Sequence, residues 1–301
     1  MFSSLNCLIL CIIKPLTTLV ALALMGHSAF ASVISFVKND VHSIQDTNKV
    51  AAIVNDKLQS DSQIGTGDKS MCELSFDDKS VTRIGEHSVF SFQEQERLIK
   101  CGDGKFLVSK DPDTAPITVT AGGVTAAIAG STVLFDVKGG IAHVAVVETT
   151  TGVTVTDENG KAVTLQSGEG IAAAPGGLTS AVPRPVDVKA MTETSPLFTE
   201  AGLAPLANAA AIQGVTSAQD IAKQAGASFA SDINDVMSGK MDGATALAKT
   251  GGMDVPDIDT AAGAETAASN NNATPPNTPQ PNLQLVPPVN SRPNPFEATP
   301  I

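Results

Sequence analysis

Two aromatic residue types are missing from this 301-residue chain, which contains no tryptophan and no tyrosine. Proteins that stack sugars or nucleic-acid bases usually do so on flat, amphipathic rings. The 11 phenylalanines have no polar edge and are better suited to a core. The composition therefore disfavours a stacking platform for carbohydrates or nucleic acids.

The short motifs of common catalytic and metal sites are also missing. The chain contains no Gly-x-Ser-x-Gly and no His-Glu-x-x-His. His42, His87 and His143 are isolated, and three lone histidines without a ligand spacing do not indicate a metal site. We therefore predict no catalytic residue, no cofactor and no metal site, and we predict that the protein is not an enzyme.

Three further segments are interpreted as turns. In the segment from Gly65 to Ser70, Asp68 stands where a phosphate-binding loop needs glycine directly before lysine. Asp77-Asp78 and Asp157-Glu158-Asn159 have oxygen ligands suited to calcium, but no full ligand loop follows either of them. Solvated turn acids are the commoner case.

Acidic residues outnumber basic ones by 31 to 19, which gives a net charge of −12. Lys14 is the single Lys, Arg, Asp or Glu among the first 31 residues, so removing that segment leaves 18 − 31 = −13. Such a surface repels phosphate backbones and anionic lipid headgroups. Nucleic acid is therefore excluded as an expected partner.

The first 31 residues have the pattern of a secretion signal. Lys14 is followed by an apolar stretch from Leu16 to Met25 and then by Ala29-Phe30-Ala31, a small-x-small cleavage pattern. We predict cleavage between Ala31 and Ser32 and a periplasmic or secreted protein without a stable membrane span. An uncleaved anchor is the alternative, although Lys14-Pro15 interrupts the span of ~20 residues that it needs.

Export would leave two of the four cysteines in the mature chain. Cys7 and Cys11 leave with the signal, and the mature chain keeps Cys72 and Cys101. In an oxidising compartment these two residues are candidates for a disulfide between neighbouring strands, worth ~3 kcal/mol on a chain-entropy model. Two buried thiols are the alternative, because Cys72 shares a face with Leu74 and Phe76. Both alternatives stay open.

From Ile117 to Ile171 the chain alternates apolar and polar residues with the period of two expected of half-buried strands. Gly139-Gly140 predicts a tight reversal between two such runs. Asn159-Gly160 predicts a hairpin with a primed turn, in which both residues adopt left-handed angles. The segment from Val50 to Phe92 has the same character, so we predict an all-β domain over residues 32–175.

The order and spacing of these motifs resemble the FecR domain family over about half of the chain, from Val33 to Ala174. The similar motifs are Ile64 to Gly67, Glu73-Leu74-Ser75-Phe76, Asp78, Ser80, Arg83-Ile84-Gly85, Phe90-Ser91-Phe92, Gly102 to Gly104, Phe106-Leu107-Val108, Ile117-Thr118-Val119, Gly130-Ser131, Val133, Phe135 and Val163 to Glu169. Of these, Gly130, Ser131 and Phe135 are taken as family-motif residues, with Ser131 standing where the family usually has threonine.

The resemblance implies a periplasmic all-β module, like a β-solenoid or sandwich, that scaffolds or relays protein contacts. The best-known members take a signal from a TonB-dependent transporter and control a sigma factor through a cytoplasmic N-terminal domain. We expect this chain to lack that domain, because its apolar leader begins at residue 1.

After Ala174 the composition changes. Prolines and glycines predict a linker over residues 176–205, and alanine-rich sequence predicts a helical segment over 206–251. Its main helix is expected to begin at a capping box of Thr216 and Gln219. The helix carries a stripe in which the possible docking residues are Ile221, Phe229 and Ile233; packing of that stripe on the chain's own β-domain is the alternative.

Residues 252–301 contain nine prolines between Pro275 and Pro300 and few large apolar residues, which predicts a disordered tail. From the whole chain we predict a non-enzymatic scaffold module that binds envelope proteins or a second copy of itself. The alternatives are a signalling regulator linked to a TonB-dependent transporter and sigma factor, and a self-assembling structural protein of the envelope.

Overall fold

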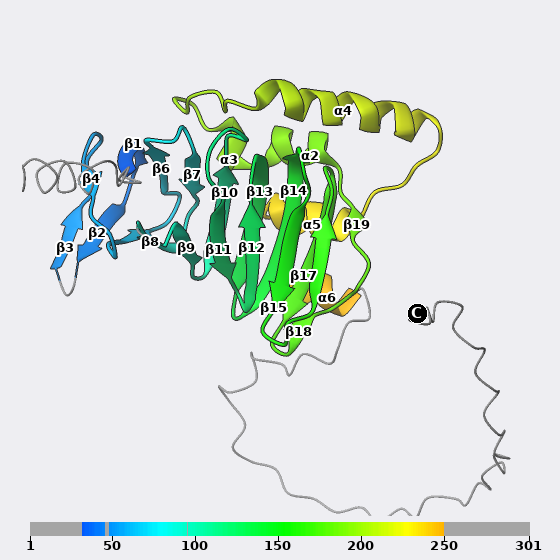
Figure 1. Ribbon diagram of the computed structural model, residues 1–301, viewed down its shortest axis with the longest axis horizontal. Helices are drawn as coiled ribbons and strands as arrows, with labels where there is room; N and C mark the ends of the chain where they lie inside the picture. The colour runs from blue at the N-terminus through cyan, green and yellow to red at the C-terminus, as the bar shows by residue number, and fades with distance from the viewer. Residues whose placement is uncertain (1–31, 46–47, 95, 250–301) are drawn as a thin grey trace, which may run out of the picture. The chain divides into compact units, whose positions relative to one another are not determined.

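Two long sheets form the body of the described structure, and a group of helices covers one of them (Figure 1). The computed structural model describes residues 32–45, 48–94 and 96–249, which all fall in one compact unit. The predicted signal segment and the predicted tail lie outside the described residues. The strands are β1 (Ser32–Lys38), β2 (Val41–Gln45), β3 (Asn48–Ala51), β4 (Lys57–Leu58), β5 (Gln63–Thr66), β6 (Met71–Phe76), β7 (Val81–Ile84), β8 (Val89–Gln93), β9 (Leu98–Cys101), β10 (Gly104–Ser109), β11 (Ile117–Ala121), β12 (Val124–Ile128), β13 (Ser131–Lys138), β14 (Ile141–Thr149), β15 (Val153–Asp157), β16 (Ala162–Leu165), β17 (Glu169–Ala174), β18 (Gly177–Leu178) and β19 (Arg184–Pro185).

The chain alternates between the two sheets, usually one hairpin at a time. Sheet A has the order β18-β17-β14-β13-β10-β7-β6-β1-β4, with β19 also on β17, and sheet B has the order β16-β15-β12-β11-β9-β8-β5-β2-β3. Neighbouring strands are antiparallel except β9 and β11, which are parallel. The reason is that a single strand, β10, lies between them in the chain, so the chain returns to sheet B in its original direction.

The main core lies between the sheets. It gathers inward-facing residues of both sheets, including Leu74, Phe106 and Phe135 of sheet A and Phe90 and Val155 of sheet B. Strands of sheet B such as β12 and β15 alternate buried and exposed residues, because their other face meets water. In contrast, β13 and β14 are buried along nearly their whole length, so sheet A is covered on both faces.

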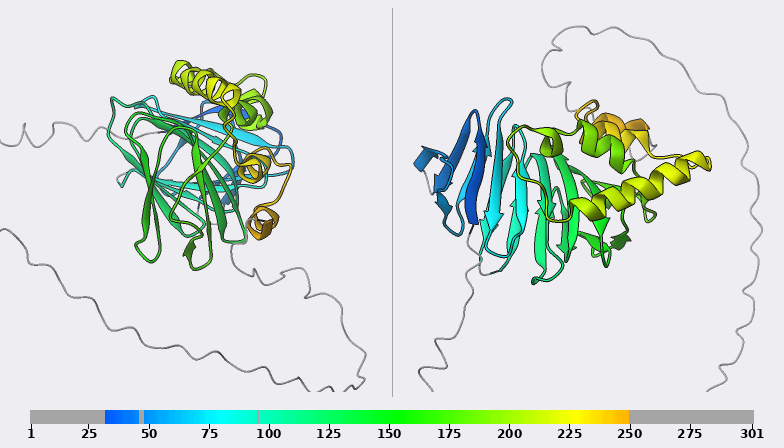
Figure 2. Two further views of the ribbon diagram at one scale, coloured as in Figure 1. Left: turned by 90° about the vertical axis from the view of Figure 1, so that its right-hand side faces the viewer. Right: turned by 90° about the horizontal axis from the view of Figure 1, so that it is seen from above.

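Five helices supply the second cover of sheet A (Figure 2). A second core joins Leu107, Leu134 and Ala145 on the outer face of that sheet to Met191 and Ile233 of the helices. The helices are α2 (Val188–Thr194), α3 (Pro196–Thr199), α4 (Ala209–Gln224), α5 (Ser231–Met237) and α6 (Gly243–Lys249). The expected linker over residues 176–205 therefore contains β18, β19, α2 and α3, and the helical part packs on the sheets as one unit with them.

The predicted hairpins form, with one correction. Gly139 and Gly140 both have positive φ and join β13 to β14 in a tight turn. Between β15 and β16, however, Gly160 is left-handed (φ 79°) and Asn159 is not, so the predicted primed turn is wrong. The Asp157 carboxylate accepts hydrogen bonds from the backbone N–H groups of Asn159 and Lys161, both 2.9 Å, which favours a turn with one left-handed glycine.

The predicted single helix from Thr216 onward is also wrong. Helix α4 begins at Ala209 and ends at Gln224, and Gly226 (φ 91°) separates it from α5. Thr216 lies inside α4, where its hydroxyl donates to the Ile212 carbonyl, so it does not cap the helix. Glycine accepts the left-handed conformation that ends a helix, and this outweighs the apolar stripe continuing past it.

Candidate functional site

The N-terminal end of the two packed sheets is open. Strand β3 pairs with β2 on one side, and no other described strand pairs with its second edge. All four residues of β3 are exposed. Opposite β3, sheet A ends in β4, which has only two residues, so sheet B extends beyond its cover.

Val50 of β3 lies on the core-facing side of sheet B but remains uncovered. Register places Val50 beside Ser43, Ser43 beside Ile64, and Ile64 beside Phe90. Ile64 and Phe90 are fully buried, whereas Val50 is 61% exposed. This row of core-facing residues in sheet B therefore continues beyond the end of sheet A, which covers the rest of the row.

Two more apolar side chains extend this surface. Ile53 is 63% exposed and Val54 is 42% exposed, in the loop between β3 and β4. The loop is held by backbone hydrogen bonds from Asn55 N to Ile34 O (2.8 Å) and from Ile34 N to Asp56 O (2.9 Å). We call Asn48–Ala51 together with Ile53 and Val54 the open edge, since its apolar groups stand on ordered backbone.

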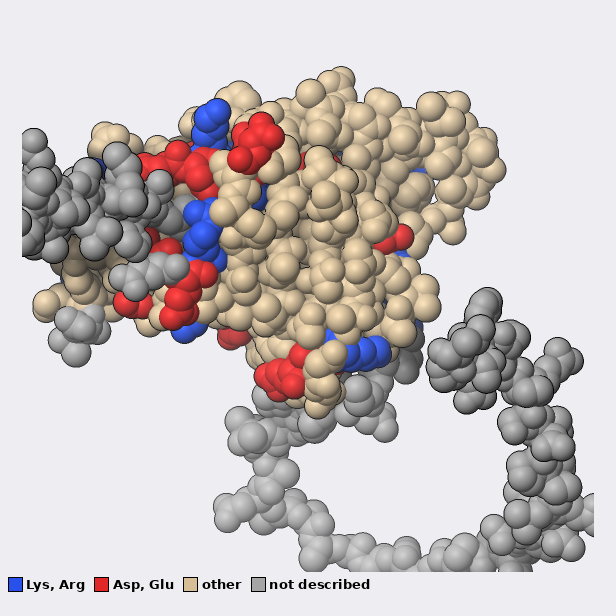
Figure 3. All heavy atoms as spheres, viewed as in Figure 1, with Lys and Arg blue, Asp and Glu red and all other residues tan. Residues whose placement is uncertain are grey.

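Charge is unevenly placed around this end. In the view of Figure 3, Lys, Arg, Asp and Glu gather over the N-terminal strands, whereas the surface over the later strands is largely uncharged. The outer face of sheet B explains part of this contrast, because Thr118 and Thr120 of β11 and Thr154 and Thr156 of β15 point outward there. Within β3 itself, Lys49 is the charged residue.

A buried ion pair connects the β-sheets to the helical cover. Arg83 Nε lies 2.7 Å from Glu73 Oε2, and both side chains are nearly inaccessible. The same guanidinium donates to the carbonyl of Leu197 (2.8 Å) and to the carbonyl of Ala204. Arg83, a residue of the Arg-Ile-Gly motif, therefore positions the chain on both sides of the α3 end.

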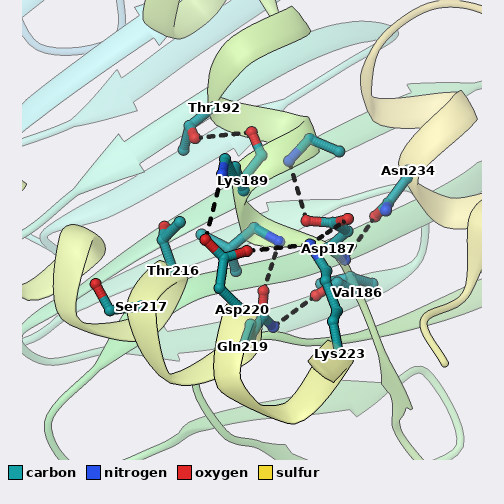
Figure 4. Close-up of polar contacts among 12 residues, drawn as sticks. Val186, Asp187, Lys189, Thr192, Thr216, Ser217, Gln219, Asp220, Lys223 and Asn234 are labelled. Atoms are coloured by element: carbon teal, nitrogen blue, oxygen red, sulfur yellow. Dashed lines mark hydrogen bonds and ion pairs between the residues drawn. The ribbon is translucent and has the colours of Figure 1, made fainter. Parts of the chain in front are cut away.

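Two other polar side chains, Asn208 and Gln219, hold the cover in place. Asn208 donates to Glu148 and to Thr132 Oγ1 (2.6 Å), while burial raises the pKa of Glu148. Figure 4 shows Gln219 of α4 binding the start of α2: its Nε2 donates to Val186 O (2.8 Å), and its Oε1 accepts from Val188 N (2.9 Å). Gln219 thus joins two helices and has no capping role.

The predicted docking residues do not share one surface. Ile221 on α4 is 69% exposed, whereas Ile233 on α5 is buried against sheet A. Phe229 lies between the two helices, with the Lys223 ammonium 5.3 Å from its ring centre. For α5 the alternative interpretation is the correct one, since it packs on the chain's own sheet.

The family-motif residues have structural positions. Gly130 (φ 76°) precedes β13, and a Cβ there would lie 2.6 Å from Pro112 Cβ. The Ser131 hydroxyl donates to Thr149 Oγ1 (2.7 Å), and Phe135 is buried in the main core.

The two described cysteines are free thiols buried in the main core. Cys72 lies on β6 of sheet A and Cys101 on β9 of sheet B, so the two residues are not on neighbouring strands. Burial raises the pKa of Cys72 to about 12 and raises that of Cys101 as well. Neither thiol is activated for chemistry at neutral pH.

The histidines do not converge. His42 pairs with Asp40 (3.0 Å) and His87 with Asp68 (2.9 Å), while His143 is buried under α6. The described ranges contain no group of three His, Cys, Asp or Glu placed to hold a metal ion. Asp78, considered as a turn acid, instead binds Arg97 (2.6 Å) and the buried Lys110 (3.2 Å). No helix in the described part of the chain is long and apolar enough to span a bilayer.

The family model described as "FecR protein" matches residues 62–151. This match identifies residues 62–151 as a FecR segment. The matched FecR segment contains the Glu73–Arg83 pair, Gly130, Ser131 and Phe135. The open edge and the helical cover lie outside it.

Among solved structures, two crystal structures of a candidate anti-sigma factor from Parabacteroides distasonis are similar to this chain. Both are 14% identical, with TM-scores of 0.37 and 0.36. The alignments cover 43% and 45% of this chain and 62% and 68% of those chains, so the first falls short of two thirds of its relative. No curated protein sequence matches the chain significantly.

Proposed function

We propose that this FecR-domain protein is a non-enzymatic binding module of the bacterial envelope, and that it binds an extended segment of another envelope protein at the open edge. The observation that carries the proposal is the exposure of Val50 on the core-facing side of sheet B. A strand added beside β3 would pair its free backbone groups and continue the sheet. The added segment would also cover the apolar side chains of the open edge.

The composition of the edge favours a different protein over a second copy of this one. If β3 paired with β3 of another copy in an antiparallel register centred on Lys49, the two ammonium groups would lie directly opposite each other. Lysine on an edge strand is a common device against such self-pairing. We therefore expect a partner segment with an acidic residue opposite Lys49 and apolar residues toward Val50, Ile53 and Val54.

The test is site-specific photo-crosslinking in the native envelope, with the photoreactive residue placed at Val50. A matched control places it at Thr154, an exposed strand position on the outer face of sheet B. We expect one discrete heterologous product from position 50 and none from position 154. Adding Lys49→Glu should abolish the product, because it reverses the charge that the partner faces.

Two outcomes would contradict the proposal. A product containing two copies of this chain would make the open edge a self-association surface. Equal products from positions 50 and 154, insensitive to Lys49→Glu, would mean that the edge has no special role.

A further inference from the structure

Three ionisable side chains form a row on the outer face of sheet A. Register places Lys105 of β10 beside Asp136 of β13, and Asp136 beside His143 of β14. Lys105 Nζ lies 3.0 Å from Asp136 Oδ2 and also donates to the Val236 carbonyl of α5. His143 therefore ends a charged row that the helices cover.

The imidazole of His143 is enclosed without a partner for one nitrogen. The residue is 1% exposed, and its Nδ1 is buried with no hydrogen bond. The first residue of α6 lies directly against the ring: a Cβ added to Gly243 would be 2.9 Å from His143 Cε1 and 3.0 Å from Nδ1. A glycine at this position lets the helix approach the imidazole closely.

Helix α6 packs against β13 and β14 of sheet A and against α5. Its buried Leu247 packs with Ile141 and Ala174 in a small cluster separate from the two larger cores. The helix has seven residues, and helices this short depend on tertiary packing because propensity alone does not sustain them. The docking of α6 therefore depends on its contacts with sheet A and α5.

We propose that His143 and α6 form an acid-sensitive latch, in which α6 stays docked on sheet A while the imidazole is neutral and is released when the imidazole gains a proton. An imidazolium has two N–H donors and a positive charge, and the docked state offers Nδ1 no acceptor. Release of α6 gives the protonated ring access to water.

The charged surroundings set the direction of the response. Burial lowers the pKa of His143; the carboxylates of Asp136 and Asp232 raise it, and Lys105 lowers it. Asp232 of α5 is already paired with Arg184 of β19, and Lys249 of α6 lines the same cavity of about 540 Å³ as His143. Because the docked pKa is below the released value, docking is complete above the released pKa and weakens as pH falls below it.

Release of α6 would change where the rest of the chain is attached. The backbone N–H groups of residues 238–241 are bonded to carbonyls of α5, so release of α6 would let 8 residues (249 − 242 + 1) join the segment beyond residue 249. A fully extended stretch of that length adds up to about 28 Å of reach. It would also uncover the outer face of β14 at His143.

The test is amide hydrogen exchange of the full chain between pH 7.5 and 5.0, corrected for the intrinsic pH dependence of exchange. With a released pKa of 6.5, the opening equilibrium of α6 rises by up to about 30-fold over this interval. We expect at least a fivefold loss of protection in residues 243–249, while residues 71–84 of β6 and β7 stay protected. His143→Phe and His143→Gln should remove the pH dependence, and His87→Gln, at an exposed histidine, should leave it intact.

A separate pair of variants examines the contact itself. Gly243→Ala should loosen α6 already at pH 7.5, whereas Gly214→Ala in α4, where a Cβ meets nothing within 4 Å, should not. The proposal is overturned if α6 protection in the wild type does not depend on pH. It is also overturned if protection is lost equally in residues 71–84, or if the loss persists in both His143 variants. If those variants do not fold, the pH series of the wild type and His87→Gln still decides between these outcomes.

Discussion

Arg83 and Glu73 face each other across β7 and β6, with 2.7 Å between Nε and Oε2, in a place that solvent scarcely reaches. The carboxylate also accepts a hydrogen bond from the Ser35 hydroxyl (2.8 Å), and the guanidinium binds carbonyls of the segment around α3. Every polar atom of the pair that needs a partner is thus supplied from the sheet or from the cover. This polar contact joins the FecR segment to the helical cover.

Removing one member of this pair should be costly. Arg83→Met leaves the Glu73 carboxylate buried without its counter-ion, so we expect a loss of about 3–5 kcal/mol in the free energy of unfolding, measured by urea denaturation. The double variant Glu73→Leu/Arg83→Met should recover part of that loss, because no buried charge remains. Lys189→Met, which breaks an exposed pair with Asp220, should have a much smaller effect. An Arg83→Met variant as stable as the wild type would contradict the stabilising role of this ion pair.

Gly130 should tolerate substitution less well than Gly160, although both are left-handed at φ 76° and 79°. At Gly160 a Cβ meets nothing within 4 Å, so Gly160→Ala should cost only the conformational penalty of about 1–2 kcal/mol. At Gly130 the Cβ would also clash with Pro112, so Gly130→Ala should cost about 3 kcal/mol or more. Equal melting temperatures for the two variants would show that the approach of Pro112 does not matter.

The contribution of Glu148 to the stability of the folded state should depend on pH. Its pKa is raised by burial, so its ionised form is disfavoured in the folded state once the pH exceeds the unfolded value of 4.5. The cost of ionising this buried carboxyl is therefore absent below pH 4.5 and grows as pH rises toward neutrality. Glu148→Gln should therefore gain stability relative to the wild type at pH 7 and little at pH 4, in paired denaturation curves. A gain that is the same at both pH values would contradict this assignment.

The two buried thiols should be unreactive in the folded protein. Their raised pKa values leave almost no thiolate at pH 8, so iodoacetamide should modify Cys72 and Cys101 slowly without denaturant and rapidly in guanidinium. Mass spectrometry of protein purified from the envelope and denatured without reductant should show both sites alkylated. An unmodified pair that becomes reactive only after reduction would demonstrate the disulfide instead.

The strands of the main core could be predicted from the sequence because their signal is local. Alternation around Val133 and Phe135 and the Gly139-Gly140 reversal need only neighbouring residues, and the structure confirms both. The turn at Asn159 could not be specified, since it depends on how the Asp157 carboxylate binds backbone N–H groups on both sides. The prediction of one continuous apolar stripe from Ile221 to Met237 was wrong, because Gly226 interrupts the helix and because sheet A decides which of these residues are buried.

The functional surfaces could not be predicted from the sequence, because they arise from contacts between residues that are far apart in the chain. Arg83 and Glu73 could be placed in motifs similar to the FecR family, but their pairing could not be predicted, and the carbonyl partners of Arg83 lie more than 100 residues away. Val50 gave no local signal, because its exposure arises where sheet B extends past the two-residue strand β4. Which residues a sheet leaves uncovered is decided by the other sheet.

The most direct measurement of the central claim is amide hydrogen exchange of residues 48–51, in the purified protein and after incubation with envelope extract from which this protein has been deleted. The account predicts fast exchange in the purified protein and at least tenfold slower exchange in the extract, because the added strand pairs the free edge. The Lys49→Glu variant should show no slowing. Unchanged exchange at 48–51, with new protection on the outer face of sheet B or on the helices, would contradict the account.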